Sequence, residues 1–136
     1  MWNAACAIFH RTRTHCVHGA CCACGAAKSA RGNVAGGNPA TTDVVRIAYR
    51  DGVSASQCKL HSGRTHQIRV HMAAIHHPLV GDQVYGKHNP KLPEFPRQAL
   101  HATRLGLVHP LTGFKMQWEV PMPEDMRDLL DGLRYG

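Results

Sequence analysis

The first 42 residues of this chain contain no aspartate or glutamate, although they hold four basic side chains. The same lack recurs in residues 61–72, which contain two arginines and three histidines but no acid. Such a stretch cannot neutralise itself, so we expect it to bind an anion or a carboxylate from elsewhere. The net charge of +7 favours a polyanionic partner such as nucleic acid, with a solvated basic surface as the plain alternative.

The chain also lacks a run of about 18 apolar residues, so no membrane-spanning segment is predicted. A secretory signal is missing, because the apolar stretch 4–9 is short and continues into basic residues. We therefore expect a cytoplasmic location. Five of the six cysteines lie in the first 24 residues, but without a secretory signal a disulfide framework is not predicted.

Residues 1–36 lack helical and strand periodicity, and we expect them to form a disordered Cys/Ala/Gly-rich leader. Within them Cys21 and Cys24 have a zinc-binding spacing, and His15 and His18 are further ligand types for this metal. The histidine pair lies too close to the cysteines to leave a ligand turn between them. A zinc module at this end is therefore only a lesser alternative.

A second histidine pattern recurs every fifth residue, at His61, His66, His71 and His76. Five residues turn a helix by about 500°, so successive histidines are displaced by roughly 140° around the axis. Metal-binding helices place their ligands four residues apart, on one face. We therefore predict no metal site in this stretch.

From residue 37 the chain has the patterns of a folded α+β domain. Alternating or β-branched runs predict strands, and Asp51-Gly52 predicts a hairpin turn between the first two. Apolar residues at helical spacing predict two helices, with acids at the start of the second where the helix dipole favours them. The expected strands are 44–49, 54–60, 100–108 and 114–120, the expected helices are about 65–76 and about 124–134, and a loop spans 79–97.

In the first expected helix, Thr65 is a suitable N-cap and Ile68, Met72 and Ile75 form one apolar stripe. Arg69 lies off this stripe, one turn from the helix N-terminus. A helix N-terminus offers free N–H groups, and Arg64 adds charge beside it. Since an arginine fork binds planar carboxylate or phosphate groups with two parallel bonds, we predict an anion site here. A surface helix whose arginines contact only water is the competing interpretation.

Several motifs in order carry a family resemblance. Residues 63–72 read Gly-Arg-Thr-His-Gln-Ile-Arg-Val-His-Met, and residues 77–86 read His-Pro-Leu-Val-Gly-Asp-Gln-Val-Tyr-Gly. Residues 97–102 and 109–113 continue as Arg-Gln-Ala-Leu-His-Ala and His-Pro-Leu-Thr-Gly. Together they resemble the RluA/RluD-type ribosomal RNA pseudouridine synthases, most of all the RluD branch. Residues 37–42 resemble that family's Gly-Lys-Pro-Ala-x-Thr segment, with Asn38 where lysine is usual.

The resemblance implies that residues 37–136 are the C-terminal portion of the synthase catalytic domain, with an antiparallel-rich mixed sheet. It implies isomerisation of uridine to pseudouridine in large-subunit ribosomal RNA, without cofactor or metal. The chemistry uses one aspartate, which an arginine orients, and by motif position that arginine is Arg69. The RNA-contacting residues implied are Arg64, His66, Arg69, His71, Arg97 and His101.

The chain departs from the family at the reactive acid. That aspartate lies in a His-Arg-Leu-Asp motif, which only residues 10–13 echo here, as His-Arg-Thr-Arg. The first acid of the chain is Asp43, and Asp82 lies in a different motif, so we do not expect either to be the nucleophile. We therefore expect this polypeptide to be inactive alone, with a non-catalytic, basic RNA-binding remnant as the alternative function.

Overall fold

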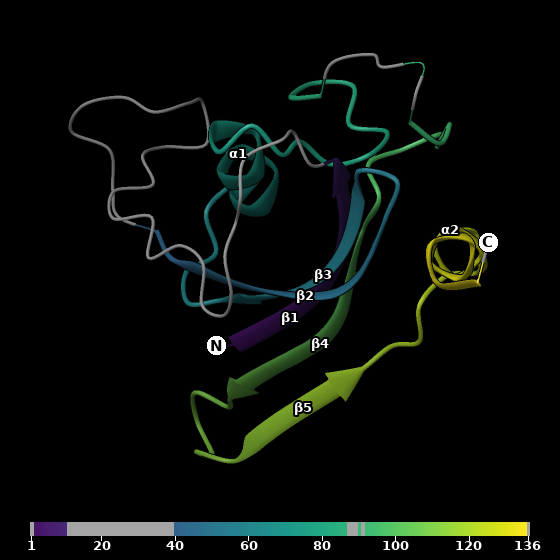
Figure 1. Cartoon of the computed structure of the whole chain (residues 1–136). Helices are drawn as coiled ribbons and strands as arrows, with labels where there is room; N and C mark the ends of the chain where they lie inside the picture. The colour runs from purple at the N-terminus through teal and green to yellow at the C-terminus, as the bar shows by residue number, and fades with distance from the viewer. Residues whose placement is uncertain (1, 11–39, 87–89, 91, 136) are drawn as a thin grey trace.

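The computed structural model describes residues 2–10, 40–86, 90 and 92–135, which build one curved sheet and two helices (Figure 1). The strand order in the sheet is β2-β3-β1-β4-β5, and each of the four pairings is antiparallel. The expected α+β class is confirmed, and no parallel pair occurs among the described strands. The strands are β1 (Trp2–His10), β2 (Thr42–Arg50), β3 (Val53–Leu60), β4 (Leu100–Val108) and β5 (Lys115–Glu119); the helices are α1 (Gln67–Ala74) and α2 (Glu124–Tyr135).

Strand β1 is the centre of the sheet, between β3 and β4. The prediction that residues 1–36 lack regular structure is therefore wrong for residues 2–10. The residues of β1 show no alternation of apolar and polar types, and that alternation is the pattern from which a strand would have been predicted. Residues 11–36 lie outside the described residues, so the expectation of disorder there and the boundary at residue 36 remain predictions.

The hairpin of β2 and β3 forms as predicted. Asp51 and Gly52 both have positive φ, 49° and 84°, as a tight two-residue hairpin turn requires. The pairing slips between Arg46 and Ala48, where a bulge takes up one residue. Because of this bulge, Val44 packs on one face of the sheet and Ala48 on the other.

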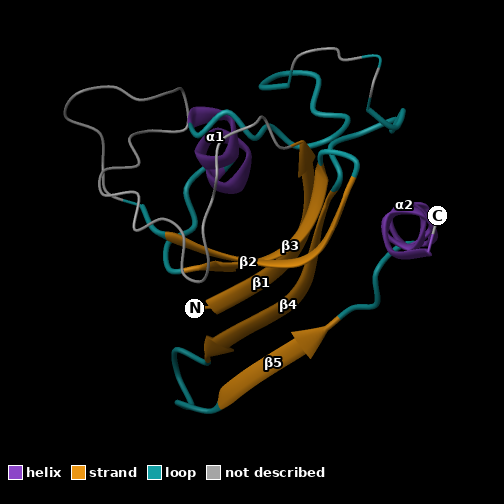
Figure 2. Cartoon of the chain, in the orientation of Figure 1, coloured by secondary structure: helices purple, strands orange, loops and turns teal. Residues whose placement is uncertain are grey.

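The two helices cover opposite faces of the sheet, and Figure 2 shows α1 inside the curve and α2 outside it. On the α1 face, Cys58 of β3 packs with Ile68 and Met72 of the helix and with Leu79. On the α2 face, the core contains Val53, Ala55, Val80, Ala99, Met126, Leu130 and Leu133. Both predicted apolar stripes are thus confirmed as the contact surfaces of their helices.

Helix α1 is shorter than the predicted range at both ends. The N-cap position is His66, with φ 53° and no side-chain cap bond, so the assignment of Thr65 as N-cap is wrong. A tight turn replaces the cap, since the Gln67 N–H donates to the carbonyl of Arg64 at 3.1 Å. At the other end His76, with φ 64°, closes the helix, and the His77 N–H donates to the carbonyl of Met72 at 2.8 Å.

The remaining elements agree with the expected ranges. Strand β4 has the predicted bounds, and β5 and α2 differ from prediction by one residue or so at their ends, as helix and strand ends commonly do. Neither described helix is both long and apolar enough to span a membrane.

Candidate functional site

Arg69 of α1 and Asp82 of the following loop form the centre of the site. The Arg69 Nε donates to Asp82 Oδ2 at 2.7 Å, and its Nη2 donates to Asp82 Oδ1 at 2.9 Å. The side chains are 11% and 0% exposed, so the pair is nearly dry. The acid-free stretch at residues 61–72 is thus neutralised in part by a carboxylate from the loop that follows the helix.

Asp82 accepts two further hydrogen bonds, from the backbone N–H groups of Val84 and Tyr85, both at 3.0 Å. Burial alone would raise the pKa of this carboxyl, but the bonds from Arg69, Tyr85 and Val84 outweigh it and hold the pKa below its ordinary value. The hydrogen bond to Asp82 likewise raises the pKa of Arg69, against the effect of burial. Both groups are therefore charged at neutral pH.

Tyr85 joins Arg69 to His66. The guanidinium carbon of Arg69 lies 5.1 Å from the centre of the Tyr85 ring, within the range of a cation–π contact. The His66 Nδ1 lies 3.2 Å from the Tyr85 hydroxyl, and the two rings meet edge to face, 5.8 Å apart. His66 is exposed, so the predicted site residues His66 and Arg69 are brought together, one at the surface and one beneath it.

Gln67 fixes the start of α1 against the start of β2. Its Nε2 donates to the Thr41 carbonyl at 3.0 Å and to the Thr42 hydroxyl at 2.9 Å. Its Oε1 accepts from the Ser62 hydroxyl at 2.9 Å and from the Arg64 backbone N–H at 3.1 Å. All of the amide's usual bonding positions are thus used, and the register of the helix that carries Arg69 is set by this side chain.

His71 lies on the same side of α1 as Gln67, with its Nδ1 3.0 Å from the Thr42 hydroxyl oxygen. Burial lowers the pKa of His71, so its imidazole is neutral at pH 7. The Thr42 hydroxyl oxygen already accepts a hydrogen bond from Gln67, so its proton is donated to His71 Nδ1. This predicted RNA-contacting residue is therefore half-buried and helps to anchor the helix.

The other predicted residues divide into one exposed arginine and two that lie away from α1. Arg64 is exposed just before the helix, and within the described part of the chain no side-chain partner is found for it. Arg97 binds Asp125 of α2 with two bonds, Nε to Oδ2 at 3.1 Å and Nη2 to Oδ1 at 3.0 Å. His101 of β4 has only a long contact, 3.5 Å from its Nε2 to the Val120 carbonyl oxygen.

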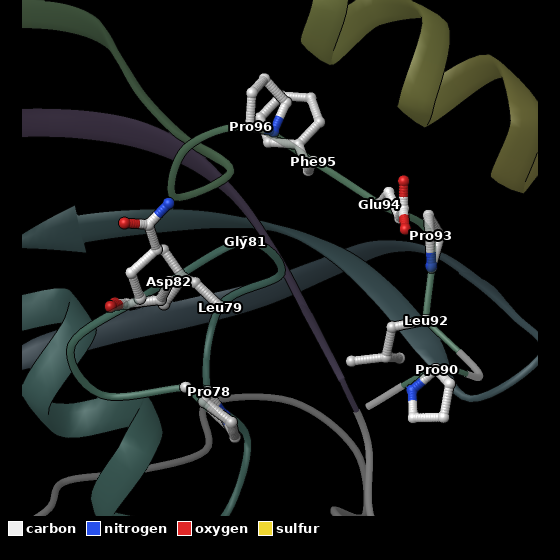
Figure 3. A pocket seen from close by; sticks show the side chains of 12 residues that line it. Pro78, Leu79, Gly81, Asp82, Pro90, Leu92, Pro93, Glu94, Phe95 and Pro96 are labelled. Carbon is white, nitrogen blue, oxygen red and sulfur yellow. The ribbon is translucent and has the colours of Figure 1, made fainter. Parts of the chain in front are cut away.

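A hollow of about 880 Å³ lies beside Asp82, between the 78–86 segment and the 90–96 segment (Figure 3). Its wall is rich in proline and contains two acids, Asp82 and Glu94. Among the described residues that line it there is no lysine or arginine. The described part of this lining therefore offers no cation for a phosphate, and the basic helix end remains the candidate anion-binding surface.

The sequence analysis did not assign four residues that the structure places in the site: Thr42, Gln67, Asp82 and Tyr85. The sequence could have predicted the turn at Asp82, because an aspartate commonly accepts hydrogen bonds from the backbone N–H groups two and three residues later, here those of Val84 and Tyr85. Its pairing with Arg69 across 13 residues depends on how the loop folds back. Among the described residues no group of three or more His, Cys, Asp or Glu lies together as a metal site would require.

Most of the chain is similar in sequence to one group of enzymes. It is 49% identical over 109 residues to the ribosomal large subunit pseudouridine synthase D of Salmonella typhimurium, and 46% over 109 residues to that of Escherichia coli K12. These matches cover 72% of this chain and 33% of each relative, so the chain spans about one third of their length. No protein-family model matches.

Solved structures show the same fold at lower sequence identity. The human RNA pseudouridylate synthase domain containing 1 superposes with a TM-score of 0.66 and 24% identity, over 99% of this chain and 66% of the human chain. The human RNA pseudouridylate synthase domain containing 4 gives 0.65 and 17%, over 98% and 62%.

Proposed function

Because this chain is a relative of the RluD-type pseudouridine synthases over 72% of its length, we propose that it is the C-terminal, RNA-contacting portion of a domain that isomerises uridine in large-subunit ribosomal RNA. The curated relatives carry this activity and substrate in their names, and the match covers 33% of their length. The proposed partner is therefore ribosomal RNA, and the proposed location is the cytoplasm. We further propose that the polypeptide alone does not catalyse the isomerisation.

The buried Arg69–Asp82 pair is the observation that carries this proposal. A guanidinium has five N–H donors, and Asp82 takes two of those of Arg69. The donors left on Nη1 and Nη2 are proposed to hold the carboxylate of a reactive aspartate that comes from outside this 136-residue sequence, since the undescribed residues contain no acid. Asp82 then acts as a positioning residue, because it fixes the plane of the fork before the second carboxylate arrives.

Asp82 itself is poorly suited to be the reactive group. It accepts four hydrogen bonds, is fully buried at its side chain and has a lowered pKa. A nucleophile or base must reach the uridine and keep a lone pair for it. The exposed Asp43 is already bound to His61, with 2.6 Å between its Oδ2 and the His61 Nε2. We therefore propose that the described residues supply the arginine that orients the reactive acid, and not the acid itself.

The activity test uses an RNA fragment of the large ribosomal subunit labelled with tritium at carbon 5 of uridine. Isomerisation releases this tritium, and we expect none above background from the purified chain. Release that grows with protein concentration would contradict the proposed inactivity and would show that a reactive group is present.

RNA binding is the second candidate function, favoured by exposed Arg64 beside the basic helix end. We expect binding that weakens steeply between low and physiological salt, because phosphate contacts release counterions. The change Arg64→Gln should weaken binding and reduce the salt slope by about one. Arg50→Gln, at the half-exposed arginine beside Asp51 in the opposite hairpin turn, is the matched control. RNA binding with the same affinity at low and physiological salt would refute an RNA-binding surface at α1. Equal weakening of binding by Arg64→Gln and Arg50→Gln would refute it as well.

An N-terminal zinc module is the third candidate function. It remains a prediction, because its four proposed ligands, His15, His18, Cys21 and Cys24, lie outside the described residues. Zinc bound in one-to-one stoichiometry by the purified chain, and lost on Cys21→Ser, would support it. Protein free of zinc after purification in zinc-containing buffer would exclude it.

A further inference from the structure

Strand β5 forms one edge of the sheet, and Figure 1 shows it outermost, beyond β4. The Val120 N–H donates to the Thr103 carbonyl at 2.9 Å, and the His109 N–H donates to the Phe114 carbonyl at 2.8 Å. In an antiparallel pair the residues that bond inward alternate with those that do not. The backbone groups of Lys115, Gln117 and Glu119 therefore point outward, and the described residues place no strand against them.

The sequence of this outer edge is complementary to itself. Strand β5 reads Lys115-Met116-Gln117-Trp118-Glu119, with a base and an acid each two residues from Gln117. When the strand is laid antiparallel on a copy of itself about Gln117, Lys115 lies opposite Glu119 at both ends. This register pairs all three outward-pointing residues, whereas a shift of the axis to Met116 or Trp118 leaves an outward residue of the strand without a partner in the other β5.

We propose that β5 pairs antiparallel with β5 of a second copy of this chain, on a two-fold axis at Gln117, so that two five-stranded sheets become one continuous sheet. Three residue pairs then exchange two backbone hydrogen bonds each: Gln117 with its symmetry mate, and Lys115 with Glu119 twice. The interface is isologous, because the same edge contributes from both copies.

The exposed apolar side chains around β5 support this register independently. Phe114, Trp118 and Val120 are 72%, 45% and 53% exposed, which is high for large apolar groups on one face of a sheet. In the proposed pairing, Phe114 lies opposite Val120 of the second copy, and Met116 lies opposite Trp118. These are the non-hydrogen-bonded pairs, where opposing side chains approach most closely. Pairing thus covers the same groups that the single chain leaves in water.

Charges on an edge strand usually discourage pairing with other strands. Here the opposite signs at equal distances from Gln117 make the charges attractive across the two-fold axis. The other edge of the sheet differs, because β2 carries a bulge between Arg46 and Ala48, and a bulge hinders regular pairing. RNA is a weaker occupant for the β5 edge, since Arg104 beside it is already bound to Glu119 at 3.0 Å.

The test is the molar mass of the purified full chain, measured by sedimentation across roughly two orders of magnitude in protein concentration. We expect a dimer that dissociates on dilution. Lys115→Glu places like charges opposite each other at both ends and should raise the dissociation constant by about tenfold or more. Gln117→Pro removes an outward N–H without removing a bond to β4, and should also favour the monomer.

Val45→Glu is the matched control, because Val45 is an exposed apolar residue, 58% exposed, on the opposite edge strand β2. It should leave the dissociation constant unchanged, and circular dichroism should show each variant folded. A wild-type chain that stays monomeric at every concentration would overturn the proposal. So would a dimer that resists both β5 changes, or one that Val45→Glu disrupts as strongly as Lys115→Glu. If a β5 variant does not fold, the other variant and the wild-type concentration series still decide the question.

Discussion

Arg69 and Asp82 meet through two parallel hydrogen bonds in a nearly dry environment, and the same loop residue also binds two backbone N–H groups. A single carboxylate therefore ties the middle of α1 to the turn at residues 82–85. This arrangement fixes the orientation of the one buried arginine among the described residues, and its consequences can be measured in the isolated chain.

The change Asp82→Asn should lower the free energy of unfolding by about 3 kcal/mol, because removal of one partner leaves a buried guanidinium without its counter-charge. The measurement is urea unfolding followed by circular dichroism. Asp125→Asn is the matched control, since Asp125 forms the same kind of two-bonded pair with Arg97 but with both side chains more than a third exposed, 39% and 38%. We expect a loss below about 1 kcal/mol there. Equal losses in the two variants would contradict the buried role of Asp82.

His71 should make the chain less stable as the pH falls below about 6.5. Burial lowers its pKa in the folded protein from the ordinary value of 6.5. The unfolded chain thus takes up a proton at a higher pH than the folded one, so the stabilising contribution is complete above 6.5 and is lost as the pH falls through the folded pKa. Unfolding midpoints in urea at a series of pH values measure this effect.

His71→Asn keeps an acceptor near the Thr42 hydroxyl but cannot be protonated, so it should flatten the pH dependence in this window. His66→Asn, at the exposed histidine with positive φ, should leave the wild-type dependence in place, since asparagine tolerates that backbone conformation. A slope that survives in His71→Asn would show that another group is responsible.

Gly81→Ala should prevent stable folding or cost several kcal/mol. A Cβ at Gly81 would lie 2.1 Å from the Arg97 carbonyl oxygen and 2.7 Å from that of Phe95, and its φ is 72°. Gly132→Ala in α2 meets no atom within 4 Å and should instead stabilise the chain by about 0.5–1 kcal/mol, because alanine is the better helix former. Thermal unfolding of the two variants compares them. A tolerated alanine at 81 would mean that the 81–97 contact is loose in solution.

Local patterns were sufficient to predict most elements from residue 42 onward. Asp51-Gly52 specified the first hairpin, and the apolar spacing of Met126, Leu130 and Leu133 specified the buried side of α2. In these places the residues that determine the structure are close in sequence. The prediction failed for β1, because its pairing partners are β3 and β4 and its own residues show no alternation.

The candidate site was half predictable for the same reason. Arg69 was identified because it lies off the apolar stripe of its helix, which is a local property. Its partner Asp82 was not, since the pairing depends on how the 78–86 segment returns to α1. The buried anchoring role of His71 also escaped prediction, because only the position of Thr42 on the neighbouring strand reveals it.

The central place of β1 has a consequence for how the chain folds. Asn3 pairs with Leu60 on one side and with Leu105 on the other, whereas β2–β3 and β4–β5 are hairpins closed by short turns. The hairpins can form early from nearby residues, but the strand between them must pair with residues that lie far away along the sequence, which slows folding. Strand β1 ends at His10 and β4 begins at Leu100, so β1 can complete its pairing only after β4 has been synthesised. Strand β1 is thus synthesised before both of its neighbours in the sheet.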